Sequence, residues 1–171
     1  GYFAGQGYAV LRVDMRGSGE SDGLLADEYL LQEQEDALEV IDWISQQTWC
    51  SGAVGMMGKS WGGFNCLQLA ARRPPALKAI ITVCSTDDRY NDDIHYKGGC
   101  LLNDNLWWGG IMLAYQSRPQ DPALVGDVWY QDRLHSLEKM HFFPALWMDH
   151  LGSAPGRERG KFSVVALLLK P

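Results

Sequence analysis

Three features that define large classes of proteins are missing from this sequence. There is no run of about 18 apolar residues, so no membrane-spanning helix is expected. There is no excess of basic residues: 15 Lys and Arg stand against 21 Asp and Glu, a formal charge of −6. A general nucleic-acid binder would show a basic face. The first residues have neither the basic start nor the apolar core of a secretory signal. We therefore expect no nucleic-acid partner and no membrane partner.

The four cysteines lack the C-x-x-C spacing of zinc sites and redox pairs. They are Cys50, Cys66, Cys84 and Cys100. Cys66 and Cys84 lie in apolar runs, where cysteine usually packs as a small hydrophobic side chain. We expect buried free thiols rather than a disulfide framework, which is typical of a cytoplasmic protein.

The 171 residues are enough for one domain, or for one domain and part of another. The hydrophobic content of 46% can build a core, and seven Trp predict an aromatic-rich interior or pocket. The opening residues, "GYFAGQGYAV", lack an initiator Met and are typical of the middle of a domain. We expect the N-terminus to be truncated.

Short apolar runs alternate with helical patterns in the first half of the chain. The runs at 8–14, 53–57 and 77–85 predict buried strands. Residues 27–47 carry apolar side chains along one face and acids along the other, which predicts an amphipathic helix. Residues 61–72 are apolar almost all round and predict a buried helix, ended by two prolines. This order predicts an α/β fold, with a parallel sheet and helices on both faces.

The pattern changes after Thr86. "DDRYNDDIHYKGG" predicts a polar loop, whereas "LLNDNLWWGGIMLAYQ" and "WYQDRLHSLEKMHFFPALWMDH" are helical and aromatic. We expect a partial core over 1–86, a helical cap insertion over 87–150 and a separate tail over 151–171. The tail is compatible with a loop and a fourth strand at "FSVVALLL", or with out-of-frame translation.

"AVGMMGKSWGG", residues 53–63, has two interpretations. As a loosened phosphate loop it would make Lys59 and Ser60 nucleotide ligands. That loop needs its strand earlier, at the poor strand sequence "QTWCSG", and would have to use the apolar run as loop. As G-x-S-x-G, the apolar run is the strand, and Ser60 lies at the tip of a nucleophile elbow between Gly58 and Gly62. The second interpretation fits better.

"RGSGESDG", residues 16–23, is similar to a dinucleotide-binding loop. Its third Gly falls one position late for G-x-G-x-x-G, because Asp22 stands in that place. No acidic residue closes a second strand about 20 residues further on. We expect a tight loop instead, which Asp14 and Arg16 could brace by a charge-assisted bond.

"GYAVLRVDMRGSGESDG", followed by the segment from "QEQEDALEV" to "STDDRY", resembles the α/β-hydrolases of the cocaine-esterase and X-prolyl dipeptidyl-peptidase group. These are serine hydrolases of esters or amides. The resemblance covers about residues 7–150, and "GGCLLNDNLWWG" and "MLAY" resemble the start of that family's helical cap domain. D-x-R-G-x-G-x-S, WC-x-G-x-V-G and G-x-S-x-G in this order are more specific together than any one motif.

The resemblance implies that Ser60 is the nucleophile and that the Trp61 N–H is an oxyanion donor. The family's second donor is a tyrosine hydroxyl before the first strand, and neither Tyr2 nor Tyr8 matches its motif. The family's acid and base occur in Gly-aromatic-Asp-Gly and Gly-Pro-Trp-x-His contexts, which this sequence lacks. We therefore expect the acid, the base and a C-terminal jelly-roll domain to lie outside this chain.

Other residues are weaker candidates for the triad. A base must be within hydrogen-bond reach of Ser60 and oriented by an acid. The available acids after the third strand, and the available histidines, are Asp87, Asp88, His95, His135, His141 and His150. We expect these histidines to be surface or cap-packing residues, and the acids to cap turns rather than bind metal.

The sequence thus predicts a serine hydrolase of an ester or peptide small-molecule substrate, with no metal or organic cofactor. Trp107, Trp108 and Tyr115 would shape an apolar acyl pocket, or simply pack the cap. The 171 residues alone would be inactive or nearly inactive. A non-catalytic binding module is the rival hypothesis, and a homo-oligomer of the full-length protein is compatible with the sequence.

Overall fold

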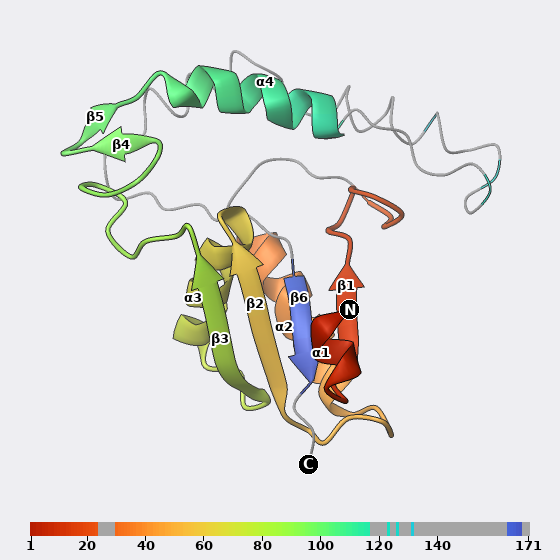
Figure 1. Cartoon of the computed structure of the whole chain (residues 1–171). Helices are drawn as coiled ribbons and strands as arrows, with labels where there is room; N and C mark the ends of the chain where they lie inside the picture. Colours follow the sequence, from red (N-terminus) through yellow and green to blue (C-terminus); the bar gives the residue numbers. More distant parts are fainter. Residues whose placement is uncertain (24–29, 117–122, 124–125, 127–130, 132–163, 169–171) are drawn as a thin grey trace. The chain divides into compact units, whose positions relative to one another are not determined.

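The computed structural model of the chain describes residues 1–23, 30–116, 123, 126, 131 and 164–168 (Figure 1). The chain divides into two compact units. Unit 1 consists of Gly1–Val13, Tyr29–Asp87 and Arg159–Pro171, and unit 2 consists of Asp14–Glu28 and Asp88–Glu158. Among the described residues, none of the helices has the length and apolar character that a membrane crossing requires.

Unit 1 is built on a four-stranded sheet. Its strands lie in the order β1 (Val10–Val13), β6 (Val164–Leu168), β2 (Val54–Lys59) and β3 (Leu77–Val83). The strands predicted at 8–14, 53–57 and 77–85 are confirmed, and β2 and β3 are parallel as expected. The tail also forms a strand, β6, but it runs antiparallel to β1 and β2. The described sheet is therefore mixed rather than wholly parallel.

Two helices cover one face of this sheet, and both were predicted (Figure 1). In α2 (Leu31–Ser45), Ala37, Ile41 and Ile44 are buried at the spacing of one helical face. α3 (Trp61–Arg72) packs against both β2 and β3. It ends where Arg73 takes a left-handed conformation, with φ 52°, directly before the two prolines. A short helix, α1 (Tyr2–Gly5), precedes β1.

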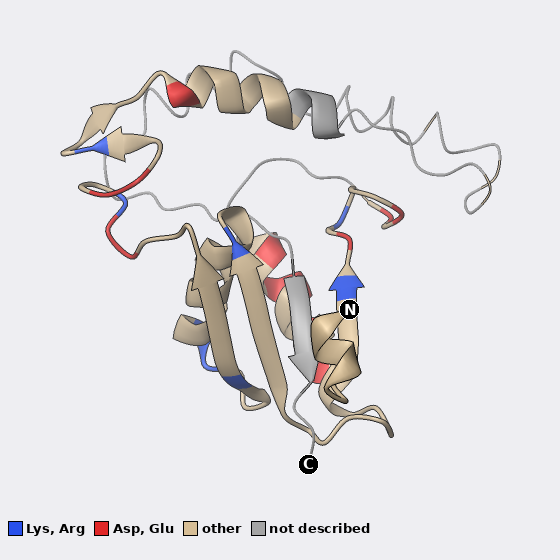
Figure 2. Cartoon of the chain, viewed as in Figure 1, with Lys and Arg blue, Asp and Glu red and all other residues tan. Residues whose placement is uncertain are grey.

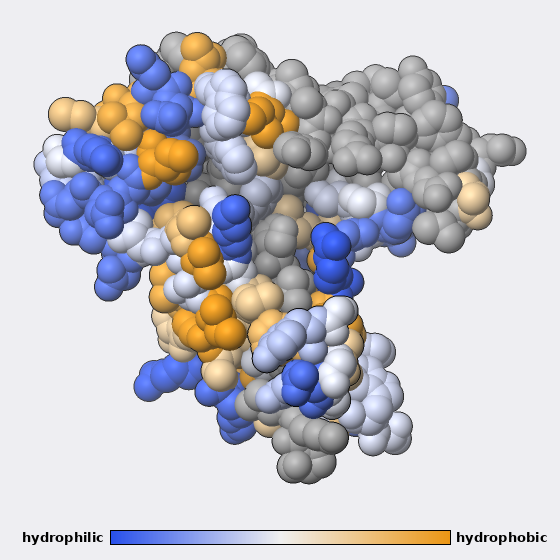
Figure 3. Space-filling model, viewed as in Figure 1, coloured by the Kyte–Doolittle hydropathy of each residue, from blue (hydrophilic) through white to orange (hydrophobic). Residues whose placement is uncertain are grey.

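The opposite face of β3 is apolar and exposed. Val54 and Met56 of β2 are buried, so the alternate residues of the pleat point to the other face. Ile81 and Val83 lie on that face, and they are 45% and 46% exposed. Figure 3 shows apolar residues gathered over the position of β3.

Unit 2 contains one predicted and one unpredicted element. α4 (Asp104–Gln116) confirms the helix expected in "LLNDNLWWGGIMLAYQ". The polar loop expected before it is wrong in part, because β4 (Tyr96–Lys97) and β5 (Cys100–Leu101) form a hairpin. The hairpin turns through Gly98 and Gly99, at φ 55° and 77°, which suits a two-residue turn. The helix expected over 129–150 lies outside the described residues, and the domain boundaries stay predictions.

All four cysteines are free, as predicted, but only one is buried. Cys66, in α3, is fully enclosed, and burial raises the pKa of its thiol to about 11. Cys84 and Cys100 are exposed and Cys50 is half-buried. The expectation of burial is wrong for Cys84 because β3 ends at Val83, and Cys84 turns out of the strand with φ 55°.

Candidate active site

The centre of the candidate site is a one-residue turn between β2 and α3. β2 ends at Lys59, α3 begins at Trp61, and Ser60 alone connects them. Ser60 has φ 54° and ψ −118°, which is a strained conformation for a residue with a side chain. Such strain costs about 1–3 kcal/mol and persists only where the surroundings enforce it. A serine held in this way between a strand and a helix has the context that the nucleophile elbow requires.

Two hydrogen bonds hold the backbone of Ser60. Its N–H donates to the carbonyl of Val83 at 2.7 Å, which ties the turn to the end of β3. Its carbonyl accepts the N–H of Phe64 at 3.0 Å, which begins the bonding pattern of α3. Because both backbone groups are bonded, the turn is fixed at the C-terminal ends of β2 and β3. The side chain of Ser60 is half-buried.

Gly58 is required by close contact rather than by its own backbone angles. A Cβ at Gly58 would lie 2.0 Å from both the carbonyl carbon and the carbonyl oxygen of Gly62. The first turn of α3 therefore lies directly against β2, with no room for a methyl group. Gly63 is similarly enclosed, since a Cβ there would lie 2.6 Å from the Oγ of Ser85 and 3.1 Å from the Val83 carbonyl. These contacts place the helix start against the strand ends.

The phosphate-loop interpretation does not fit this backbone. The residues that would have to form the loop, 54–57, pair with β3 on one side and with β6 on the other. Their backbone groups are committed to the sheet, whereas a phosphate loop presents its N–H groups to the ligand.

The glycine-rich loop at 14–23 is closed by its own acid. The Asp14 carboxylate accepts the N–H of Glu20 at 3.0 Å, and the Asp14 carbonyl accepts the hydroxyl of Ser21 at 2.7 Å. Gly19, at φ 53°, leaves no room for a Cβ beside that carboxylate. The Asp14 carboxylate thus takes a backbone N–H of this loop, whereas a dinucleotide-binding loop presents such groups to a pyrophosphate.

The acids after β3 are engaged in local turns. Asp88 accepts two hydrogen bonds from Asn91, at 2.7 Å from the side chain and 3.1 Å from the backbone. The side-chain bond, followed by the backbone bond, lowers the pKa of the Asp88 carboxyl. Asp87 is exposed. Among the residues that the structure describes, no group of three or more His, Cys, Asp or Glu could hold a metal ion.

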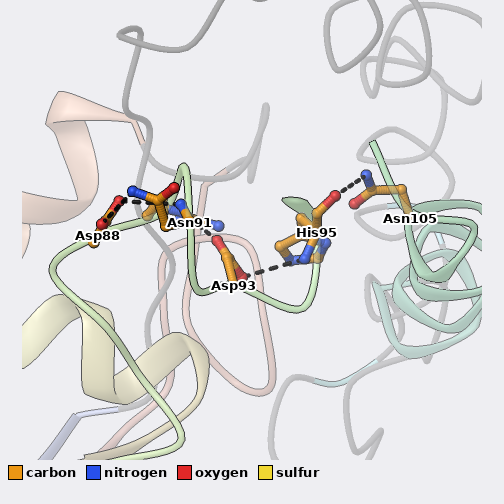
Figure 4. A network of polar contacts seen from close by, with 6 residues as sticks. Asp88, Asn91, Asp93, His95 and Asn105 are labelled. Carbon is orange, nitrogen blue, oxygen red and sulfur yellow. Dashed lines mark hydrogen bonds and ion pairs between the residues drawn. The ribbon is translucent and has the colours of Figure 1, made fainter. Parts of the chain in front are cut away.

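His95 belongs to a polar network within unit 2 (Figure 4). The buried Asp93 accepts the Nε of Arg89 at 2.6 Å and the backbone N–H of His95 at 3.3 Å. The His95 carbonyl in turn accepts the N–H of Leu102 at 3.0 Å and the side-chain amide of Asn105 at 3.4 Å. This network joins the hairpin to the start of α4, and His95 is buried within it.

The remaining candidates are the histidines proposed as base and the aromatic residues of the predicted acyl pocket. All four histidines of the sequence belong to unit 2, whereas Ser60 belongs to unit 1. His135, His141 and His150 lie outside the described residues. In α4, Trp107 is 66% exposed and Trp108 is half-buried, while the side chain of Tyr115 lies outside the described part. The acyl pocket therefore stays a prediction.

Two buried polar side chains near the elbow were not foreseen from the sequence. Asn65 is fully buried in α3, and within the described chain neither polar atom of its amide has a hydrogen-bond partner. The Oγ of Ser85 is likewise buried without a partner among these residues. The apolar pattern of α3 indicates burial but does not show that an amide lies inside it.

The sequence was also compared with known proteins. It is 39% identical over 97 residues to a protein of Mycobacterium tuberculosis described as a putative serine esterase, covering 57% of this chain and 15% of that protein. It is 34% identical over 128 residues to the cocaine esterase of a Rhodococcus species, covering 71% of this chain and 22% of the esterase. No solved structure matches the chain significantly.

These curated relatives are several times longer than the chain, which spans about a fifth of their length. The family model described as "X-Pro dipeptidyl-peptidase (S15 family)" matches residues 1–152. That match covers most of the 171 residues, including both units' described helices and the elbow. The chain thus belongs to the S15 family of X-Pro dipeptidyl-peptidases and has a partial α/β-hydrolase fold.

Proposed function

We propose that the protein containing this chain is a serine hydrolase that cleaves an ester or an amide, with Ser60 as its nucleophile. The observation that carries the proposal is the strained backbone of Ser60 at the tip of a strand–turn–helix elbow. Family membership, and relatives described as esterases and as X-Pro dipeptidyl-peptidases, support the same reaction class.

The reaction begins when a histidine takes the proton of the Ser60 hydroxyl and the oxygen attacks the carbonyl carbon. The tetrahedral oxyanion accepts a hydrogen bond from the N–H of Trp61, the first residue of α3. The positive end of the helix dipole favours the same charge. The intermediate then expels the leaving group, which takes a proton from the histidine, and water hydrolyses the acyl-enzyme.

We propose that the base, the acid and the second oxyanion donor come from segments that these 171 residues do not include. The absence of both family sequence contexts for the acid and the base supports this, as does the greater length of the relatives. The chain alone should then be nearly inactive, since removing triad members costs several orders of magnitude in kcat. The free thiols also favour a reducing compartment such as the cytoplasm, which fractionation of the producing cells would test.

Hydrolysis of p-nitrophenyl acetate tests the proposal. We expect the full-length protein to turn the ester over, Ser60→Ala to abolish turnover, and the isolated chain to match the Ser60→Ala background. Ser85→Ala is the matched control, because Ser85 lies beside Gly63 but is no part of the proposed machinery. Turnover that survives in Ser60→Ala would contradict the role of Ser60, whereas no turnover by the folded full-length protein would favour the rival hypothesis of a non-catalytic binding module.

A further inference from the structure

Lys59 is the one charged residue of the elbow that the proposed reaction leaves without a role. It is exposed at the C-terminal end of β2, which Figure 2 shows as basic. Within the described part of the chain, its side chain forms no hydrogen bond and no ion pair. Lys78, by contrast, at the start of the neighbouring strand, donates to the Pro75 carbonyl at 2.7 Å.

The position of Lys59 is fixed relative to the reacting serine. It directly precedes Ser60, so their Cα atoms are about 3.8 Å apart. Its partner in the β2–β3 register is Val83, whose carbonyl accepts the N–H of Ser60. The backbone of Lys59 is therefore held by the same strand pairing that holds the elbow. Only the flexible four-carbon stem of the side chain can move, so the ammonium stays within the reach of that stem from the residue next to the nucleophile.

We propose that Lys59 recognises a carboxylate on the substrate, and that the protein therefore prefers esters or amides that carry a free carboxylate close to the bond that is cleaved. This inference rests on the proposed function of Ser60. An ammonium without an internal partner attracts an anion at short range, and a substrate group held beside Ser60 falls within that range. The family-wide chemistry of the serine does not require this charge, so Lys59 would set substrate preference.

Phosphonate esters that react covalently with an activated serine provide the test, on the full-length protein. One uncharged diester, an ethyl p-nitrophenyl alkylphosphonate, is compared with two anionic relatives that each add one carboxylate. One of these carries a carboxylate at the end of the alkyl chain, and the other carries it on the aryl leaving group. The measured quantity is the second-order rate of labelling, expressed as the ratio of anionic to neutral probe, so differences in general reactivity of Ser60 cancel.

We expect at least one anionic probe to react about fivefold faster than the neutral probe, the effect of one unscreened charge pair at about 4 Å in water. The ratio should fall to about one in Lys59→Met and persist in Lys59→Arg. It should also fall as NaCl is raised from about 0.01 M to about 1 M, where the screening length drops to about 3 Å. Lys78→Met is the matched control and should leave the ratio unchanged.

The possible failures are distinct. If the neutral probe labels Ser60 but Lys59→Met leaves both ratios unchanged, the role of Lys59 is refuted and the proposed function stands. If neither kind of probe labels Ser60, the proposed function fails and the inference about Lys59 fails with it. If the wild-type protein reacts with both anionic probes about as fast as with the neutral probe, the preference for carboxylates is also refuted.

Discussion

Replacing Gly58 by Ala tests the closest contact in the elbow. The added methyl carbon would lie 2.0 Å from the Gly62 carbonyl group, and the atoms it meets belong to backbone rather than to a movable side chain. Ordinary carbon contacts are about 3.5–4.0 Å, so the start of α3 must retreat by more than about 1 Å. Overpacking of this kind costs about 1–3 kcal/mol. Without the clash, Gly→Ala within a strand would stabilise by about 0.5–1 kcal/mol, so the two accounts predict opposite signs.

Urea unfolding of the chain, followed by tryptophan fluorescence, measures this difference. Gly58→Ala should lower the free energy of unfolding, whereas Gly5→Ala is the control, because a Cβ at Gly5 meets nothing within 4 Å. In the full-length protein, Gly58→Ala should also slow ester hydrolysis by about 100-fold, the usual cost of a 1 Å displacement at a catalytic group. A Gly58→Ala chain as stable as the unmodified one would refute the close packing of α3 on β2.

Three further outcomes follow from the described residues. Ser60→Gly should relieve the strain of a positive φ and so raise the free energy of unfolding by about 1–3 kcal/mol, reduced by the entropy cost of glycine. Equal or lower stability in urea would contradict the strain. A thiol reagent at pH 8 should modify the exposed Cys84 in the folded chain but reach Cys66, with its pKa of about 11, only on unfolding, as peptide mass mapping would show. Asn91→Ala should raise the pKa of Asp88, as an NMR titration would show. Because the pKa is lowered in the folded state, any stability from this contact is present at pH values above the usual carboxyl pKa and is lost as the pH falls. An unchanged titration would contradict the hydrogen bonds.

The elbow was predictable because its signals are local. An apolar run, a Gly-flanked Ser and an apolar helix follow one another within 20 residues, and each signal acts on its own segment. The end of β2 was less predictable, because the strand continues through Gly58 to Lys59 by pairing with β3. That extension depends on a partner about 25 residues away and not on the apolar pattern.

The features that the sequence did not predict depend on distant contacts or on weak patterns. β6 pairs between β1 and β2 across more than 100 residues, and nothing in "FSVVALLL" specifies its antiparallel direction. The hairpin at 96–101 did leave a signal, the Gly-Gly pair, but two-residue strands are too short to show alternation. The exposure of Cys84 follows from the single backbone angle that ends β3.

The central claim is that Ser60 is an activated nucleophile in the protein that contains this chain. The most direct measurement is labelling of that full-length protein with a fluorophosphonate, followed by mass mapping of the adduct. We predict a single adduct on the peptide containing Ser60, absent in Ser60→Ala and retained in Ser85→Ala. An adduct on another serine, or none while the protein remains folded, would contradict the claim.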